Sequence, residues 1–279
     1  MAEFLARRER FAVVGSTNDV VRGWLADGTP EVCLAVADEQ TAGRGRDGRT
    51  WQAPVGGALL LSLGFRPSWL EPVQVWRLAA SVSLAMADAA EATSGLPGGA
   101  IRLKWPNDLV IETDGLAVPM APAEPTAVRK VAGVLGETDG LGTDDPRVVV
   151  GIGIDTDWAA ADFPPELADT MTSLREASHG RPIDHVALLD AFLGRLEVRI
   201  EALRLGRFDV GDWTERQLTS GRDVTLTDPD GSSRVVRALG VDAASGALVI
   251  EDADAADGER AVVVGEIRHV RLAAPTVGV

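Results

Sequence analysis

The segment 43-GRGRDGRTW-51 and the residues after it restrict the fold of this chain more than any other feature. Its three glycines have the G-x-G-x-x-G spacing of a dinucleotide-binding loop, which leads from its third glycine into a helix. Here a proline and two glycines within residues 52–57 prevent a helix. The next element is the apolar run 58-ALLLSLGF-65, which predicts a strand. The sequence therefore excludes a Rossmann fold.

The same loop carries three arginines, Arg44, Arg46 and Arg49, followed by Trp51. A solvated turn would explain the glycines, but it would not explain these side chains in a chain whose formal net charge is −15. Guanidinium groups match the planar geometry of carboxylate and phosphate groups, and an indole ring offers a face on which a purine can stack. We interpret the segment as a loop that closes around an anionic ligand.

The remaining patterns predict an α+β fold in two domains. Helical spacing predicts helices at 16–27, 72–93, 184–205 and 208–218. Apolar runs predict strands at 31–40, 58–65, 101–112 with a turn at 106–108, 130–137 and 147–154. After residue 220 only short alternating runs remain, at 223–228, 234–241, 247–252 and 261–272. We therefore expect a mixed sheet packed with helices in residues 1–218 and a small all-β domain in residues 219–279.

Composition excludes several functional classes. The acidic balance disfavours a protein that binds nucleic acid in general. The lone cysteine, Cys33, cannot form an internal disulfide, and with three scattered histidines it offers no zinc spacing. The sequence shows no signal peptide and no apolar run long enough to span a membrane. These observations predict a cytoplasmic protein without a membrane or nucleic-acid partner.

Three other stretches fit an anionic ligand. The turn 104-KWPND-108 presents Lys104, Asn107 and Asp108, which suit a nucleotide phosphate with Mg²⁺, although a capped turn with surface charges has the same composition. Lys130 begins the strand at 130–137, where a lysine is often only a solvated strand end. Two glycines interrupt the buried strand in 151-GIGID-155, which indicates close approach of backbone or ligand.

Together these motifs resemble those of the biotin protein ligases. The resemblance rests on 16-STN-18, Gln40 with 43-GRGRDGRTW-51, 104-KWPND-108, 130-KVAGVLGE-137 and 151-GIGI-154, which occur in the family's order. It implies a mixed-sheet catalytic domain of the biotin/lipoate ligase type and an SH3-like β-barrel at 219–279. It also implies a two-step reaction, in which biotin and ATP form biotinyl-5′-AMP before a lysine of a biotin carboxyl carrier domain in a biotin-dependent carboxylase takes the biotin.

The resemblance also implies roles for individual residues. It assigns biotin binding to Ser16, Thr17, Asn18, Gln40, Arg44, Gly45, Arg46, Lys130, Gly133 and Gly151. It assigns ATP and adenylate binding to Arg44, Arg46, Arg49, Trp51, Lys104, Asn107, Asp108 and Lys130. Catalysis would depend on Lys130, Arg46 and Asp108, and Asp108 would be a ligand of Mg²⁺.

Several features depart from the family pattern. Asp47 and Asp155 stand where arginine and asparagine are usual, and the loop at 113–128 is longer than expected. About fifteen residues precede Ser16, too few for the DNA-binding domain of the repressor members, so we expect a ligase without repressor activity, as a monomer or weak homodimer. The alternatives are a lipoate-protein ligase or octanoyl transferase of the same fold, or a non-catalytic biotin or adenylate sensor.

Overall fold

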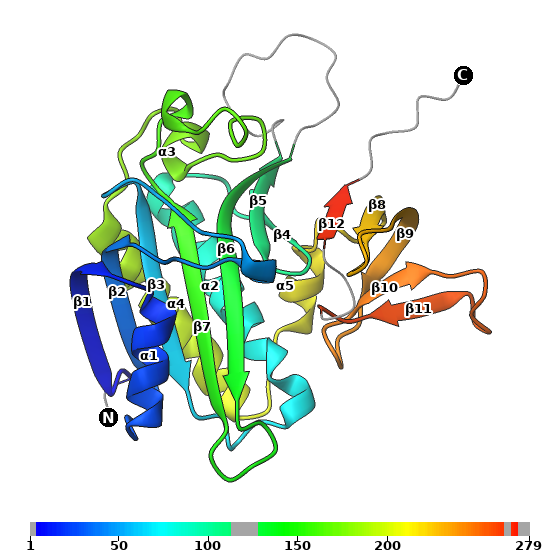
Figure 1. The fold of residues 1–279 in the computed structure, drawn as a ribbon, viewed down its shortest axis with the longest axis horizontal. Coiled ribbons are helices and arrows are strands. Elements are labelled where there is room, and N and C mark those ends of the chain that lie inside the picture. Colours follow the sequence, from blue (N-terminus) through cyan, green and yellow to red (C-terminus); the bar gives the residue numbers. More distant parts are fainter. Residues whose placement is uncertain (1–3, 113–127, 265–268, 273–279) are drawn as a thin grey trace.

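The computed structural model describes residues 4–112, 128–264 and 269–272, which form two β-sheets with helices around the larger one (Figure 1). The larger sheet has the strand order β1-β2-β3-β7-β6-β5-β4. Its strands are β1 (Arg7–Val14), β2 (Cys33–Gln40), β3 (Ala58–Phe65), β4 (Ile101–Lys104), β5 (Asp108–Glu112), β6 (Val128–Asp139) and β7 (Arg147–Asp155). β1 pairs with β2 in parallel and all other neighbours are antiparallel, so the predicted mixed sheet and the α+β class are confirmed. The long loop at 113–128 lies almost wholly outside the described residues.

Strand β1 is an edge strand that the sequence pattern did not predict. Most of its side chains are exposed, including those of Arg7 to Arg10. An edge strand has one neighbour and much of it is hydrated, so it lacks the apolar alternation by which strands are recognised. β1 carries the chain to Ser16, directly before the first helix.

Helices cover both faces of the larger sheet (Figure 1). α1 (Thr17–Ala26) packs on β2, β3 and β7, while α2 (Trp76–Ser94) packs on β4, β6, β7 and α4 (His185–Arg204). A short helix, α3 (Leu174–Ala177), was not predicted. Alternation along β7 serves both faces: its even-numbered residues from Val148 to Ile154 enter the main hydrophobic core, whereas the intervening Gly151 and Gly153 face the side of α1. The glycine-containing face is the one left available for a ligand.

The second sheet has five antiparallel strands in the order β11-β10-β9-β8-β12. They are β8 (Arg222–Thr227), β9 (Ser233–Val241), β10 (Leu248–Glu251), β11 (Glu259–Val262) and β12 (His269–Leu272). The single strand expected at 261–272 is therefore two strands on opposite edges of this sheet. The sheet has its own hydrophobic cluster, which also contains Trp105 from the first part of the chain. The domain boundary at 218/219 and the SH3-like assignment stay predictions.

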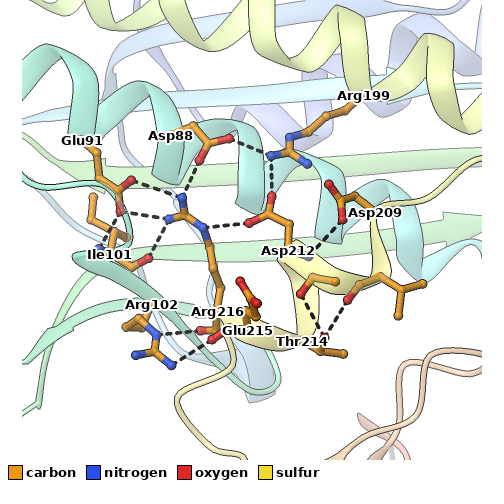
Figure 2. Close-up of polar contacts among 12 residues, drawn as sticks. Asp88, Glu91, Ile101, Arg102, Arg199, Asp209, Asp212, Thr214, Glu215 and Arg216 are labelled. Carbon is orange, nitrogen blue, oxygen red and sulfur yellow. Dashed lines mark hydrogen bonds and ion pairs between the residues drawn. The ribbon is translucent and has the colours of Figure 1, made fainter.

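A network of ion pairs ties α5 (Val210–Glu215) to α2 and to the beginning of β4 (Figure 2). Arg216 lies at its centre and pairs with Asp88 at 2.6 Å, Glu91 at 2.9 Å and Asp212 at 3.2 Å. It also donates to the backbone oxygen of Ile101. The predicted helix at 208–218 ends at Glu215, since Gln217 instead bridges to Leu103 in β4.

We expect Arg216→Met to lower the free energy of unfolding by about 3 kcal/mol, because it leaves the buried carboxylate of Glu91 without its charged partner, whereas Asp88 and Asp212 keep their pairs with Arg199. The side chain of Glu91 is only 5% exposed, so water cannot replace the lost guanidinium there. Urea denaturation measures the effect. Arg237→Met is the matched control: its pair with Asp223 is about half exposed and should contribute less than about 0.5 kcal/mol. Equal losses in the two variants would contradict this account.

Candidate functional site

A cavity of about 1590 Å³ lies between the 43–51 loop, the start of α1, the glycine face of β6 and β7, and the turn 104–108. Every residue predicted for the site lines it, and the motifs separated in sequence thus meet at one place. The lining also includes residues that the sequence reasoning did not select, among them Trp158, Val270 and Leu272. The roles of the individual residues stay predictions.

A chain of buried and partly buried hydrogen bonds forms one part of this cavity. Gln40 at the end of β2 accepts from the backbone N–H and the hydroxyl of Thr17, at 2.7 and 3.0 Å. Ser62 on β3 donates to the hydroxyl of Thr17 at 2.7 Å and is 2.5 Å from Oδ1 of Asn18. Ser16 precedes them at the N-cap of α1, 4% exposed and without a capping bond from its side chain. Neutral, fixed donors and acceptors of this kind suit an uncharged polar group of a ligand.

Ser62 was missed by the sequence reasoning. It lies in the run 58-ALLLSLGF-65 as the single polar residue of a strand whose residues are all buried. A buried hydroxyl needs a partner, so a lone serine in such a strand was the signal that could have drawn attention to it.

Arg44 is held by carboxylates in this structure. It pairs with Asp19 of α1 at 2.7 Å and with Glu137 of β6 at 3.5 Å. The hydrogen bond from Arg44 is the largest of the effects that lower the pKa of Asp19. Glu137 also accepts from Asn18 at 2.6 Å and pairs with Arg22 at 2.6 Å. Arg44 therefore fastens the glycine loop to α1 and β6, a contact that the sequence reasoning did not foresee.

Glycines form the floor of the cavity because side chains from above lie directly on the strands. An added Cβ at Gly151 would overlap Oδ1 of Asn18, and one at Gly153 would lie 2.6 Å from Nε1 of Trp51. At Gly133 it would lie 2.9 Å from Nζ of Lys130 and 3.1 Å from the ring of Trp51. The close approach predicted from 151-GIGID-155 is present, and Gly153 belongs to it although it was not selected.

The other side chains of the 43–51 loop do not share the contacts of Arg44. Trp51 lies over this floor, with Nζ of Lys130 5.1 Å from its ring centroid, and its buried Nε1 has no hydrogen-bond partner in the described part of the chain. Arg46 donates to the backbone oxygen of Val264 at 3.2 Å, and burial lowers its pKa. Arg49 pairs with Asp47 at 3.7 Å. Asp47, one of the departures from the family pattern, has φ 57°, a left-handed conformation that aspartate tolerates better than most residues.

A cationic centre lies at the turn 104–108. The carboxylate of Asp108 is 2.6 Å from Nζ of Lys130 and 3.5 Å from Nζ of Lys104. Burial acts to raise the pKa of Asp108, but the two ammonium groups outweigh burial and hold that pKa below its usual range. Asn107 donates to the backbone oxygen of Val134 at 3.0 Å, which attaches the turn to β6. The sequence predicted Lys104, Asn107 and Asp108 together at this turn, and the structure adds Lys130 to them.

Asp155, the other departure, is fully buried at the end of β7. Within the described residues neither of its carboxylate oxygens has a hydrogen-bond partner. Burial raises its pKa well above the usual value, and the charge of Lys130 lowers it only in part. The group is therefore neutral at pH values where an exposed aspartate is ionised.

We expect Asp155→Asn to stabilise the protein at neutral pH by about 1–3 kcal/mol, because the neutral amide does not have to take up a proton when it is buried, as the carboxylate does. The pKa of Asp155 is higher in the folded than in the unfolded chain, so the folded state binds more protons between these two values. The wild type should therefore lose stability relative to the variant as pH rises from about 4. Urea denaturation at several pH values tests this, and a variant less stable at every pH would contradict it.

The described residues contain no group of three or more His, Cys, Asp or Glu side chains that could hold a metal ion. None of their helices is both long and apolar enough to cross a membrane.

Known proteins share both the motifs and the fold. Residues 11–155 match the model of the biotin/lipoate A/B protein ligase family. The chain is 32% identical over 265 residues to the biotin–[acetyl-CoA-carboxylase] ligase of Mycobacterium tuberculosis, covering 93% of this chain and 88% of that protein. It is 33% identical over 188 residues to the bifunctional ligase/repressor BirA of Bacillus spizizenii, but that match covers 67% of this chain and about half, 51%, of the relative.

A solved structure extends the likeness to nearly the whole fold. The biotin protein ligase of Aquifex aeolicus in complex with biotin and ATP has a TM-score of 0.73 and 25% identity, covering 96% of this chain and 99% of that one. The motifs that surround the cavity lie within or directly beside the matched region. From sequence, site and fold together, this chain belongs to the biotin/lipoate A/B protein ligase family, and the relatives that match nearly its whole length are biotin protein ligases.

Proposed function

We propose that this protein joins biotin to ATP to form biotinyl-5′-AMP and then transfers biotin to a lysine of a biotin carboxyl carrier domain. The observation that carries the proposal is the order of groups along the glycine floor. The neutral hydrogen-bonding set lies over Gly151, Trp51 lies over Gly153, and Lys130 lies over the neighbouring Gly133. Successive positions on one face of a strand are about 7 Å apart. A ligand with a neutral polar head and a carboxylate tail would match this order.

We place the ureido ring of biotin at the hydrogen-bonding group formed by residues 16–18 and Gln40. The ureido ring of biotin carries two N–H donors and one carbonyl acceptor, and the buried Ser16, Thr17 and Asn18 together with the half-buried Gln40 supply complementary atoms. The glycines let the rings and the chain of biotin lie close to the backbone. Arg44 and Gly45 would cover the ligand from the loop, with Asp19 and Glu137 holding Arg44 in place.

The first step joins two anions. A biotin carboxylate oxygen attacks the α-phosphorus of ATP, and the bond to the β-phosphate oxygen breaks as pyrophosphate leaves. Two unit charges of the same sign at 4 Å repel by about 4 kcal/mol at an effective dielectric constant of 20. Lys130 and Arg46 would offset this repulsion and stabilise the charge that develops on the phosphate. The protein supplies positioning and charge in this step, and no covalent nucleophile is required.

In the second step the uncharged amine of the carrier lysine attacks the carbonyl carbon of the mixed anhydride. The bond from that carbon to the phosphate oxygen breaks, AMP leaves with the electron pair, and the amine nitrogen gives up a proton as the amide forms. Lys130 would stabilise the phosphate oxygens of the leaving AMP, just as it stabilises them in the first step.

The nucleotide would lie toward the turn 104–108. Trp51 would meet the adenine, and Arg49, Lys104 and Asn107 would face the phosphates. Asp108 fits a magnesium ion because it is ionised and its Oδ2 is only loosely paired with Lys104, at 3.5 Å. When bound together with ATP, Mg²⁺ would neutralise phosphate charge. The predicted cytoplasmic location and the monomeric or weakly dimeric state stay predictions.

The alternatives fit the site less well. An octanoyl transferase needs an activated nucleophile, but Cys33 is buried in β2, outside the cavity lining, and burial raises its pKa to about 11. A non-catalytic sensor would not need Lys130 and Asp108 paired at 2.6 Å beside the ligand floor.

Calorimetric titration with biotin, followed by biotin with Mg²⁺-ATP and mass analysis of the bound species, tests the proposal. We expect biotin to bind and to be converted to biotinyl-AMP. Binding of lipoate or octanoate in place of biotin would overturn the substrate assignment, and binding of biotin without conversion would favour the sensor.

A further inference from the structure

Trp105 is the one residue of the turn 104–108 whose ring lies in the core of the second sheet. It is 4% exposed and belongs to the hydrophobic cluster formed by Val224, Leu226 and other residues of that sheet. Its Nε1 donates to the backbone oxygen of Gly246 at 3.0 Å, between β9 and β10. Its backbone N–H donates to the hydroxyl of Thr219 at 3.0 Å, and Thr219 is fully buried.

The backbone before Trp105 is attached to the same part of the chain. The N–H of Leu103 donates to the backbone oxygen of Arg216 at 2.8 Å, and the N–H of Leu218 donates to the backbone oxygen of Leu103 at 2.7 Å. Residues 216–218 therefore lie along β4 as a parallel partner. The side chain of Arg102 bonds the backbone oxygens of Glu215 and Arg216 (Figure 2). Residues 215–218, which lead into the second sheet, therefore fix the position of β4 as far as the turn 104–108.

The other end of the turn carries the reactive groups. Asn107 exchanges two hydrogen bonds with the backbone of Val134, at 2.9 and 3.0 Å, and Asp108 pairs with Lys130. Only two residues separate Trp105 from Asp108, so we expect a shift of the indole to displace the carboxylate as well. A displacement of about 1 Å at reacting groups can lower a rate about a hundredfold.

We propose that the second sheet sets the position of the turn 104–108, and that Trp105 is the positioning residue through which it acts on the nucleotide half of the site. The kinetic test of this inference rests on the proposed function, because it measures adenylate formation. The biotin half lies on α1, β2 and β3 and has no bond to this anchor among those described above, so the two halves should respond differently to a change at Trp105.

Trp105→Phe is the test variant, because it keeps an aromatic ring in the core but removes the N–H that bonds Gly246. Trp76→Phe is the matched control. Nε1 of Trp76 donates to the backbone oxygen of Ala244 at 3.3 Å, in the same β9–β10 connection, without touching the turn 104–108. Both variants thus lose one indole hydrogen bond to the second sheet.

We expect Trp105→Phe to raise the KM for ATP in biotin-dependent adenylate formation about tenfold and to leave the Kd for biotin alone within about twofold. Trp76→Phe should change both constants by less than about twofold, even where its melting temperature falls. An unchanged KM in Trp105→Phe, or an equal rise in both variants, would overturn the inference, because the contact would then only stabilise the fold.

Amide hydrogen exchange decides the inference independently of catalysis. The N–H of Val134 bonds the backbone of Asn107 and reports on the turn, whereas the N–H of Thr17 bonds Gln40 and reports on the biotin half. Faster exchange at Val134 but not at Thr17 in Trp105→Phe would support the positioning role, and no difference at Val134 would overturn it. A wild-type protein that forms no biotinyl-AMP would refute the proposed function while leaving this result valid.

Discussion

Replacing Lys130 by alanine is expected to lower the rate of biotinyl-AMP formation about a thousandfold, with a smaller loss of biotin affinity. Nζ of Lys130 is 2.6 Å from Asp108 and 5.1 Å from the ring centroid of Trp51, between the carboxylate end proposed for biotin and the phosphates. Its charge is the stronger of the two that lower the pKa of Asp108, so the variant also leaves that buried carboxylate less well compensated. Pyrophosphate exchange with labelled ATP measures the rate.

Lys104→Ala is the control for Lys130→Ala. Lys104 approaches the same carboxylate at 3.5 Å, and its side chain is about as exposed as that of Lys130, at 19% against 24%. If the position of the charge matters and not only the summed charge, Lys104→Ala should lower the rate of biotinyl-AMP formation no more than about tenfold. Turnover near the wild-type rate in Lys130→Ala would remove the mechanism proposed above. Near-ultraviolet circular dichroism of both variants establishes that the fold is retained.

Gly151→Ala is expected to raise the Kd for biotin at least about a hundredfold. The added methyl group would overlap Oδ1 of Asn18, which is within 2.5 Å of the hydroxyl of Ser62. Asn18 also donates to Glu137 at 2.6 Å, so it cannot move aside without breaking this partly buried hydrogen bond and the buried one with Ser62. The variant therefore removes the arrangement proposed to recognise the ureido ring, and calorimetric titration with biotin measures the loss.

Gly136→Ala provides the comparison. Gly136 lies next to the β6 residue that pairs with Gly151, but an added Cβ there meets no atom within 4 Å. Its biotin affinity should stay within about twofold of the wild type, since a methyl group in open space costs little. If Gly151→Ala bound biotin as tightly as Gly136→Ala does, the glycine floor would have no role in the binding of biotin.

The sequence predicted which residues surround the cavity better than it predicted the contacts that these residues make. The motifs could be found because each combines a turn or glycine with charged or polar side chains, and such combinations are recognisable locally. The pairing of Arg44 with Asp19 and Glu137 could not be predicted from the sequence, because it depends on where α1 lies over β6. For the same reason the contact from Arg46 to Val264 was missed, since the two residues are 218 positions apart.

The main sheet shows the same division between local and long-range information. β3 and β7 were predicted because both are buried and strongly apolar. β1 was missed because it is a charged edge strand, held to its parallel neighbour β2 by backbone pairing and by the ion pair of Arg10 with Asp38, so it lacks the apolar pattern of a buried strand. The placing of Trp105 in the second sheet has no local signal at all, because a tryptophan before a proline has the same pattern wherever its ring is buried.

The cavity is lined by residues of the 43–51 loop and also by Val270 and Leu272 of β12. During synthesis the loop leaves the ribosome more than two hundred residues before β12, which at about 5–20 residues per second is a delay of at least about ten seconds. Once β7 has been made the nascent chain can form its main sheet, yet until β12 follows it lacks part of the lining of its cavity. The cavity should therefore be complete only after β12 has been synthesised.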